Sequence, residues 1–154
     1  MVIGAMLLLP LASGMQANAR PVAPQVSVEA RYVADPEPAI AFQVRAQEVH
    51  AIYKADLPWG NFYSVRLTFR DAARKQVCPL VAQPIDDPSD DEVVLSAGQV
   101  VTGQVALLHY CPSLLQLVAR GPVAVDWVYT PVVRKGQGEP IHGRITVPVT
   151  NKAP

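Results

Sequence analysis

Residues 63–70, Tyr-Ser-Val-Arg-Leu-Thr-Phe-Arg, alternate strictly between large apolar side chains and polar ones. Successive side chains of a β-strand point to opposite faces, so this period of two separates an apolar face from a polar face. A strand of this kind buries one face against a second layer and leaves the other in water. The stretch therefore predicts a half-buried strand in a layered β-structure.

The same alternation recurs along the chain, and sequences rich in Pro, Gly and Asp separate the alternating segments. The predicted strands cover residues 26–32, 40–46, 49–54, 63–70, 77–82, 93–95, 100–108, 123–129 and 141–149. Gly103 indicates a bulge within residues 100–108, because glycine inside a strand often marks one. Residues 112–118 can form a single helical turn, and residues 135–139 are expected to form a hairpin loop.

About seven to nine short strands without a long amphipathic helix predict an all-β domain, namely an immunoglobulin-like β-sandwich. A closed barrel is the alternative. The chain contains fifteen prolines. Because proline is confined to loops and edge strands, which a sandwich has in larger number, this composition favours the sandwich.

Residues 2–11 are apolar, but a membrane-spanning helix needs about twenty such residues. Ala17-Asn18-Ala19 follows with the small-x-small pattern of a signal-peptidase site. We therefore expect a signal peptide at 1–19, an extended lead-in at 20–25 and a β-sandwich domain at 26–154, with no membrane insertion after cleavage. The expected location is periplasmic or secreted.

The N-terminal apolar run lacks one usual feature of a signal peptide, since no Lys or Arg precedes it. A buried N-terminal strand or helix is the alternative. Pro10 argues against it, because proline interrupts both kinds of structure.

The chain has two cysteines, Cys78 and Cys111. In an exported protein they are expected to form one disulfide, which would stabilise the fold by about 3 to 4 kcal/mol in the chain-entropy model. Two buried free thiols are the alternative and would be typical of a reducing cytosol.

Thirteen basic and thirteen acidic residues give the chain a formal charge of zero. A protein that binds nucleic acid or an anionic membrane usually carries a basic excess. The balance therefore argues against both partners.

A pattern of turn and core positions runs from residue 94 to residue 127. It consists of Val94-x-x-Ala97-Gly98-x-x-x-x-Gly103-x-Val105-x-Leu107, then Tyr110, Leu117, Gly121 and Val123-x-Val125-x-Trp127. The pattern resembles the second half of the immunoglobulin-like sandwich domains that accompany some secreted peptidases. The resemblance implies the sandwich fold, while a fold of this kind does not by itself imply a function.

Catalytic and metal-binding motifs are not found in the sequence. His50, His109 and His142 lie far apart, without His-x-x-x-His or Cys-x-x-Cys spacing, and no Gly-x-Ser-x-Gly element is present. We therefore expect no enzymatic activity, no cofactor and no metal site. An enzyme or metal protein whose histidines converge only in the folded chain is the alternative.

The acidic run at residues 86–92 is a candidate contact site. Its five carboxylates belong to Asp86, Asp87, Asp90, Asp91 and Glu92. A solvated loop, a contact for a basic partner and a calcium site are the three interpretations. The spacing typical of calcium loops is absent, which disfavours the last.

Leu57-Pro58-Trp59-Gly60-Asn61 is the second candidate contact segment. Trp59 can serve as an exposed aromatic anchor for a partner or as a plug that covers one end of the sandwich, and the plug is favoured. Trp127 lies on the apolar face of an alternating strand and is expected in the core. The candidate partner-binding residues are Leu57, Trp59, Asn61, Asp86, Asp87, Asp90, Asp91 and Glu92.

The sequence thus predicts an exported, non-enzymatic β-sandwich that binds another protein or a cell-envelope component. The alternative function is an inhibitor or neutralising protein for a secreted hydrolase or toxin. Such an inhibitor would act through the loop at 56–61 or at 84–92.

Overall fold

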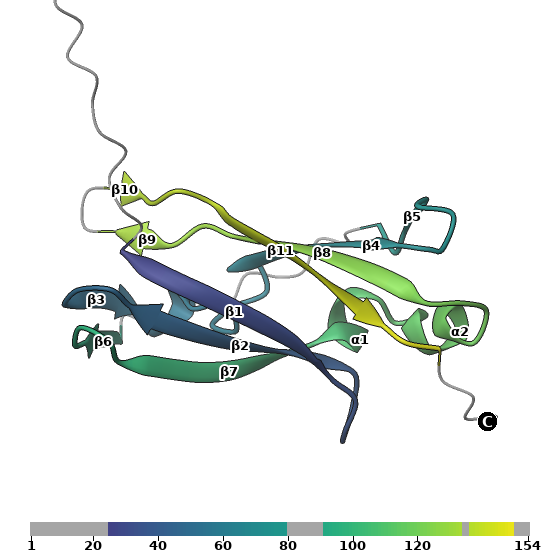
Figure 1. The fold of residues 1–154 in the computed structure, drawn as a ribbon, viewed down its shortest axis with the longest axis horizontal. Coiled ribbons are helices and arrows are strands. Elements are labelled where there is room, and N and C mark those ends of the chain that lie inside the picture. The colour runs from purple at the N-terminus through teal and green to yellow at the C-terminus, as the bar shows by residue number, and fades with distance from the viewer. Residues whose placement is uncertain (1–24, 80–90, 134–135, 150–154) are drawn as a thin grey trace, which may run out of the picture.

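The computed structural model describes residues 25–79, 91–133 and 136–149, so the predicted signal peptide at 1–19 lies outside the described residues. Within them the chain is mostly β-structure with three short helical segments (Figure 1). The strands are β1 (Val26–Val33), β2 (Ala39–Ala46), β3 (His50–Tyr53), β4 (Val65–Arg70), β5 (Gln76–Val77), β6 (Glu92–Leu95), β7 (Val100–Ala106), β8 (Val123–Tyr129), β9 (Val132–Val133), β10 (Gly136–Gln137) and β11 (Ile141–Val147). The helical segments are the 3-10 helix η1 (Lys54–Asp56) and the helices α1 (Leu107–Tyr110) and α2 (Leu114–Val118).

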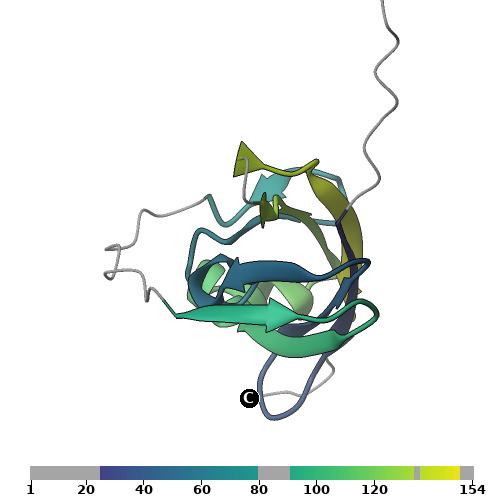
Figure 2. The same ribbon diagram turned by 90° about the vertical axis from the view of Figure 1, so that its left-hand side faces the viewer.

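Two antiparallel sheets face each other. One has the strand order β1-β2-β7 and the other β11-β8-β4-β5, and two-stranded ribbons β3-β6 and β9-β10 extend from them. Seen end-on, the sheets enclose the core, and β1 lies beside β11 along one side (Figure 2). No ladder joins β1 to β11 among the described strands, so the architecture is a sandwich rather than a closed barrel. The prediction of an all-β fold is confirmed.

The core lies between the sheets and follows the predicted alternation. In β8, Val123, Val125, Trp127 and Tyr129 are buried while the residues between them are partly exposed. The rings of Phe42 and Trp127 meet edge to face at 5.4 Å, which joins β2 of one sheet to β8 of the other. Burial of apolar surface in this layer is the main stabilising term of the fold.

The predicted strand at 100–108 is shorter than expected and has no bulge. The register between β2 and β7 is unbroken from Ala39 opposite Ala106 to Arg45 opposite Val100, and Gly103 lies directly opposite Phe42. Gly103 is instead the place where another segment approaches the strand closely, as described below. After Ala106 the chain turns into α1.

Other strand boundaries also differ from the prediction. The strand predicted at 63–70 begins at Val65, because the first two residues of that stretch belong to a hydrogen-bonded turn. β5 ends at Val77, and residues 80–82 of the strand predicted there lie outside the described chain. The predicted helical turn at 112–118 is confirmed as α2, whereas α1 was not anticipated.

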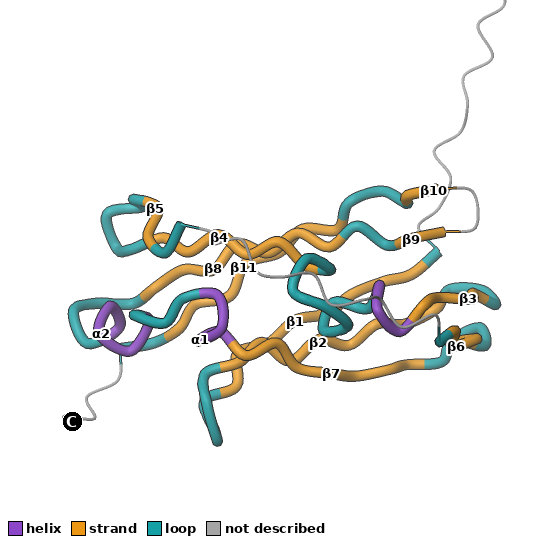
Figure 3. The backbone as a smooth tube through the Cα atoms, turned by 180° about the vertical axis from the view of Figure 1, so that it is seen from behind, coloured by secondary structure: helices purple, strands orange, loops and turns teal. Residues whose placement is uncertain are grey.

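Cys78 and Cys111 form the predicted disulfide, with their Cα atoms 5.2 Å apart. Cys111 is fully buried and directly follows α1, while Cys78 follows β5. Figure 3 shows α2 and β5 at the same end of the molecule. The alternative of two free thiols is therefore wrong. Among the described residues, no helix has the length and apolar character needed to span a bilayer.

Candidate functional site

An open groove of about 570 Å³ lies on the outer face of the β11-β8-β4 sheet, and we call it the sheet groove. Its floor includes Arg66 and Val128, whose side chains point away from the core because their strand neighbours are buried or partly buried on the other face, together with Thr130 and His142. Val128 lies opposite Arg66 on one side and opposite His142 on the other. The two basic side chains therefore flank one apolar residue across three strands.

Residues 54–64, which we call the groove loop, form one wall of the sheet groove through Asp56, Asn61, Tyr63 and Ser64. The Asn61 side chain donates to the carbonyl oxygen of Ala55 at 2.8 Å and accepts from the backbone N–H of Tyr63 at 2.7 Å. The Ser64 hydroxyl donates to the same carbonyl at 2.6 Å. Local side-chain to backbone bonds of this kind hold a loop in one conformation.

Two aromatic contacts fasten the groove loop to the rest of the domain. A Cβ atom placed on Gly103 would overlap the indole of Trp59, so the ring lies directly against the backbone of β7. The ring of Phe62 stacks on that of Tyr110 at 4.3 Å, and the Tyr110 hydroxyl donates to the Phe62 carbonyl at 2.9 Å. Burial raises the pKa of Tyr110 to about 12. A loop held this way loses little entropy when a ligand binds.

Asp56 gives the wall of the groove a carboxyl group in an unusual environment. Partial burial raises the pKa of Asp56, because removal from water disfavours the charged form. Burial, followed by the charge of Asp56, also raises the pKa of Tyr129. The Tyr129 hydroxyl is buried and has no hydrogen-bond partner in the described part of the chain.

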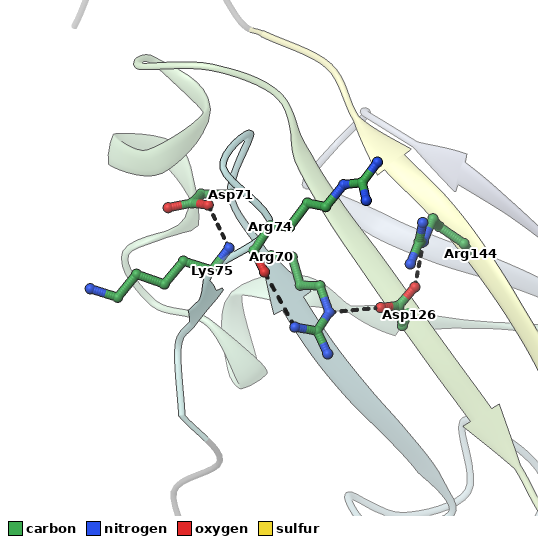
Figure 4. Close-up of polar contacts among 6 residues, drawn as sticks. All are labelled: Arg70, Asp71, Arg74, Lys75, Asp126 and Arg144. Atoms are coloured by element: carbon green, nitrogen blue, oxygen red, sulfur yellow. Dashed lines mark hydrogen bonds and ion pairs between the residues drawn. The ribbon is translucent and has the colours of Figure 1, made fainter.

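Basic side chains continue along the same face beyond the groove (Figure 4). Asp126 accepts hydrogen bonds from Arg70 at 3.1 Å and from Arg144, and so forms an ion pair with both. The hydrogen bond from Arg144 contributes most to lowering the pKa of Asp126. Arg70 also donates to the carbonyl oxygen of Arg74 at 3.3 Å.

The residues predicted to bind a partner from the groove loop occupy different environments. Leu57 is buried, Trp59 is partly buried against the core, and Asn61 is exposed and lines the sheet groove. Trp59 thus packs against the core, as the favoured interpretation expected, but it lies against Gly103 in the middle of β7 and not over one end of the sandwich.

The acidic candidates are only partly described. Asp91 is exposed and pairs with Lys54 at 3.1 Å, and Glu92 is exposed at the start of β6. Asp86, Asp87 and Asp90 lie outside the described residues, so the predicted calcium or partner contact of the run as a whole stays a prediction.

The three histidines occupy three different elements. His50 is buried in β3, His109 is exposed in α1, and His142 lies on the groove floor. Within residues 25–79, 91–133 and 136–149, no group of three potential metal ligands comes together. The buried Nε2 atom of His50 has no hydrogen-bond partner among these residues.

No protein-family model matches the sequence, and none of the curated proteins compared with it matches either. Similar solved structures include a protein called ApaA from Bordetella pertussis, at 13% identity and a TM-score of 0.40, covering 82% of this chain and 94% of that one. A structural-genomics target called SoR45 is also similar, at 11% identity and a TM-score of 0.36, covering 83% and 88%. Likenesses at this level assign no function to the chain, and the resemblance to peptidase-associated domains stays a prediction.

Sequence reasoning missed most of the sheet groove. Arg66 was recognised only as a member of a polar strand face, and His142 only as one of three scattered histidines. The alternation did identify which side chains of each strand face away from the core. What one strand does not encode is the register, which brings Arg66, Val128 and His142 into one row.

Proposed function

We propose that the protein is an exported, non-enzymatic binding module whose sheet groove takes up part of another protein or of a cell-envelope component. The observation that carries the proposal is an open groove of about 570 Å³ with polar and charged lining, built on a sheet and bordered by a fastened loop. Binding sites combine such concavity with a few placed polar groups. Rigid support of this kind favours recognition because it lowers the entropy lost on binding.

The strand order supports an immunoglobulin-like type of sandwich. The β1-β2-β7 sheet corresponds to strands A, B and E of that fold, and β11-β8-β4 corresponds to G, F and C. On this correspondence the sheet groove lies on the GFC sheet, away from the core.

Export is supported by two independent features. The sequence begins with a signal-like segment at 1–19, and the Cys78–Cys111 disulfide is of the kind that persists in oxidising compartments.

The alternative, an inhibitor that inserts the loop at 56–61 into an enzyme, has weaker support. Leu57 and Trp59 are turned towards the core of this domain, which leaves fewer apolar side chains for insertion into another protein. Asn61 and Tyr63 line the wall of the sheet groove instead.

Site-specific photo-crosslinking in envelope preparations tests the proposal. A photoreactive phenylalanine derivative at Tyr63, which lines the groove, is expected to trap a discrete adduct. The same derivative at Tyr53 is a matched control, because both tyrosines have 44% exposed surface but Tyr53 lies on β3, outside the groove. Equal adduct patterns from the two positions, or none from either, would contradict the proposal.

A further inference from the structure

We infer that the ligand of the sheet groove is an extended, acidic protein segment, which continues from the groove onto the adjoining arginine residues of the same face. This inference rests on the proposed function and specifies its partner. Three observations carry it. Arg66, Arg70 and Arg144 stand on one face of the sheet, Asp126 is the carboxylate among them, and cross-strand pairing sets their spacing.

The register of the sheet arranges these side chains in three rows. Arg66 and His142 flank Val128 in the first row, and Arg144 lies opposite Asp126 in the second. Arg70 lies opposite Ala124 in the third row. We call the outer surface of these rows the arginine face.

The arginine face carries an excess of positive charge although the whole chain is neutral. Its only acidic residue on β4, β8 and β11 is Asp126, which both Arg70 and Arg144 share. Arg66 makes no ion pair with any described residue. The guanidinium groups therefore have unused capacity to bind carboxylates, which arginine does in a bidentate geometry.

The spacing of the rows matches that of an extended peptide. Neighbouring rows are two residues apart along each strand, or roughly 6.7 Å. Side chains on the same side of an extended segment repeat at the same distance. A segment with carboxylates at alternate positions, lying along the strands, would thus meet Arg66 in the first row and then Arg144 and Arg70, whose guanidinium groups both reach Asp126 in the second row.

A protein segment fits the site better than a dense polyanion does. Binding of nucleic acid or a highly sulfated glycan depends on many basic contacts and counterion release. Here three arginines stand near two carboxylates, because Asp56 lies in the groove wall and Asp126 on the sheet. Thr130 adds a neutral hydroxyl to the groove floor, while Asn61 and Ser64 make the wall polar without adding charge.

Fluorescence anisotropy at low salt tests the inference with a labelled octapeptide of alternating Glu and Ser. The double substitution Arg66→Gln/Arg144→Gln is expected to weaken binding about four- to twenty-fivefold, at two- to fivefold for each exposed ion pair. Asp126→Asn is expected to tighten binding, because it frees Arg70 and Arg144 from their shared carboxylate. Binding by the unsubstituted protein should weaken as salt is added.

Arg31→Gln/Arg45→Gln is the matched control, since it removes the same charge from β1 and β2 at exposed positions of the other sheet. It should change the affinity less than twofold, with thermal midpoints verifying that all variants fold. Equal weakening by both double substitutions, or no tightening by Asp126→Asn, would overturn the inference. A heparin octasaccharide that binds when the peptide does not would also overturn it.

The two proposals can fail separately. If the Tyr63 crosslink forms but the acidic peptide does not bind, the groove has another kind of ligand and only the present inference is wrong. If neither experiment gives a signal, both proposals are wrong.

Discussion

Gly103 and Trp59 illustrate how single residues position the groove loop. The indole lies where a Cβ atom of residue 103 would be, so any side chain larger than hydrogen must displace the ring. We predict that Gly103→Ala lowers the free energy of unfolding by about 1 to 3 kcal/mol, the usual cost of overpacking. Urea denaturation measures the change.

Gly121→Ala is the control for this substitution, because a Cβ atom there would meet the Ala72 methyl at 3.8 Å, an ordinary contact. Its effect should stay within about 0.5 kcal/mol. Trp59→Ala should relieve the overlap, so the cost of Gly103→Ala should fall sharply in a Trp59→Ala background. An unchanged cost in that background would disprove the contact.

Two buried tyrosines provide a second comparison at this scale. The Tyr129 hydroxyl has no hydrogen-bond partner among the described residues, whereas the Tyr110 hydroxyl donates to the Phe62 carbonyl. We predict that Tyr110→Phe lowers the free energy of unfolding by about 0.5 to 1.5 kcal/mol, while Tyr129→Phe leaves it unchanged or raises it. Denaturant titration of the two variants side by side decides the matter, and equal losses would contradict it.

Asp56 and Asp126 should give stability opposite dependences on pH. The pKa of Asp126 is lowered in the folded state, so its stabilising contribution is present above the unfolded pKa and is lost as pH falls through the folded pKa. The pKa of Asp56 is raised, so ionising it destabilises the fold as pH rises from the unfolded pKa through the folded one.

We therefore predict that Asp126→Asn destabilises the protein at pH 7, by under about 1 kcal/mol for each of its exposed ion pairs, and that Asp56→Asn stabilises it there. Both effects should vanish in acid, at a pH below the folded and the unfolded pKa of each carboxyl group. Thermal unfolding at pH 7 and in acid measures them, and a common sign at pH 7 would refute the assignment.

At the scale of elements, the disulfide joins the end of a short edge strand to the end of a short helix. Cys78 follows β5, a strand of two residues at a sheet edge, and Cys111 ends α1, a single helical turn. We predict that Cys78→Ala/Cys111→Ala lowers the free energy of unfolding by about 3 to 4 kcal/mol, as the chain-entropy model gives for a loop with a sequence separation of 33.

Reduction of the unsubstituted protein is the companion measurement for the disulfide. It should lower the unfolding midpoint to that of the double variant. A loss below about 1 kcal/mol in both experiments would mean that the bridge constrains the unfolded chain far less than its loop length suggests.

The central strands were predictable because apolar residues alternate with polar ones where one face of a strand is buried in the core. β8 follows this pattern throughout, whereas β2 follows it only from Phe42 to Ala46, because its first four residues are all buried. The bulge at Gly103 was wrongly predicted because a glycine in a strand has the same appearance whether it bends the strand or admits a ring.

The sheet groove could be predicted only in fragments. Asn61 was proposed as a contact residue from its loop, but its neighbours Arg66 and His142 come from strands far apart in the sequence. Their proximity depends on cross-strand register, which turn geometry and core packing decide together. The alternation of residues within one strand carries no information on the register between strands.

At the scale of the whole molecule, the disulfide agrees with the proposed export of the chain. A bond between Cys78 and Cys111 persists where the environment is oxidising, and the signal peptide predicted at 1–19 would direct the chain to such a compartment. Cytosolic glutathione and thioredoxin would keep the same thiols reduced.

We therefore predict that the chain expressed with its own N-terminus is recovered from the periplasm or medium, begins at Arg20 and contains no free thiol. N-terminal sequencing combined with intact mass before and after alkylation measures all three properties in one sample. A version lacking residues 1–19 should stay in the cytosol and react at both cysteines. A full-length chain that begins at Met1 and carries two alkylated cysteines would contradict the location and, with it, the stabilising bridge in the cell.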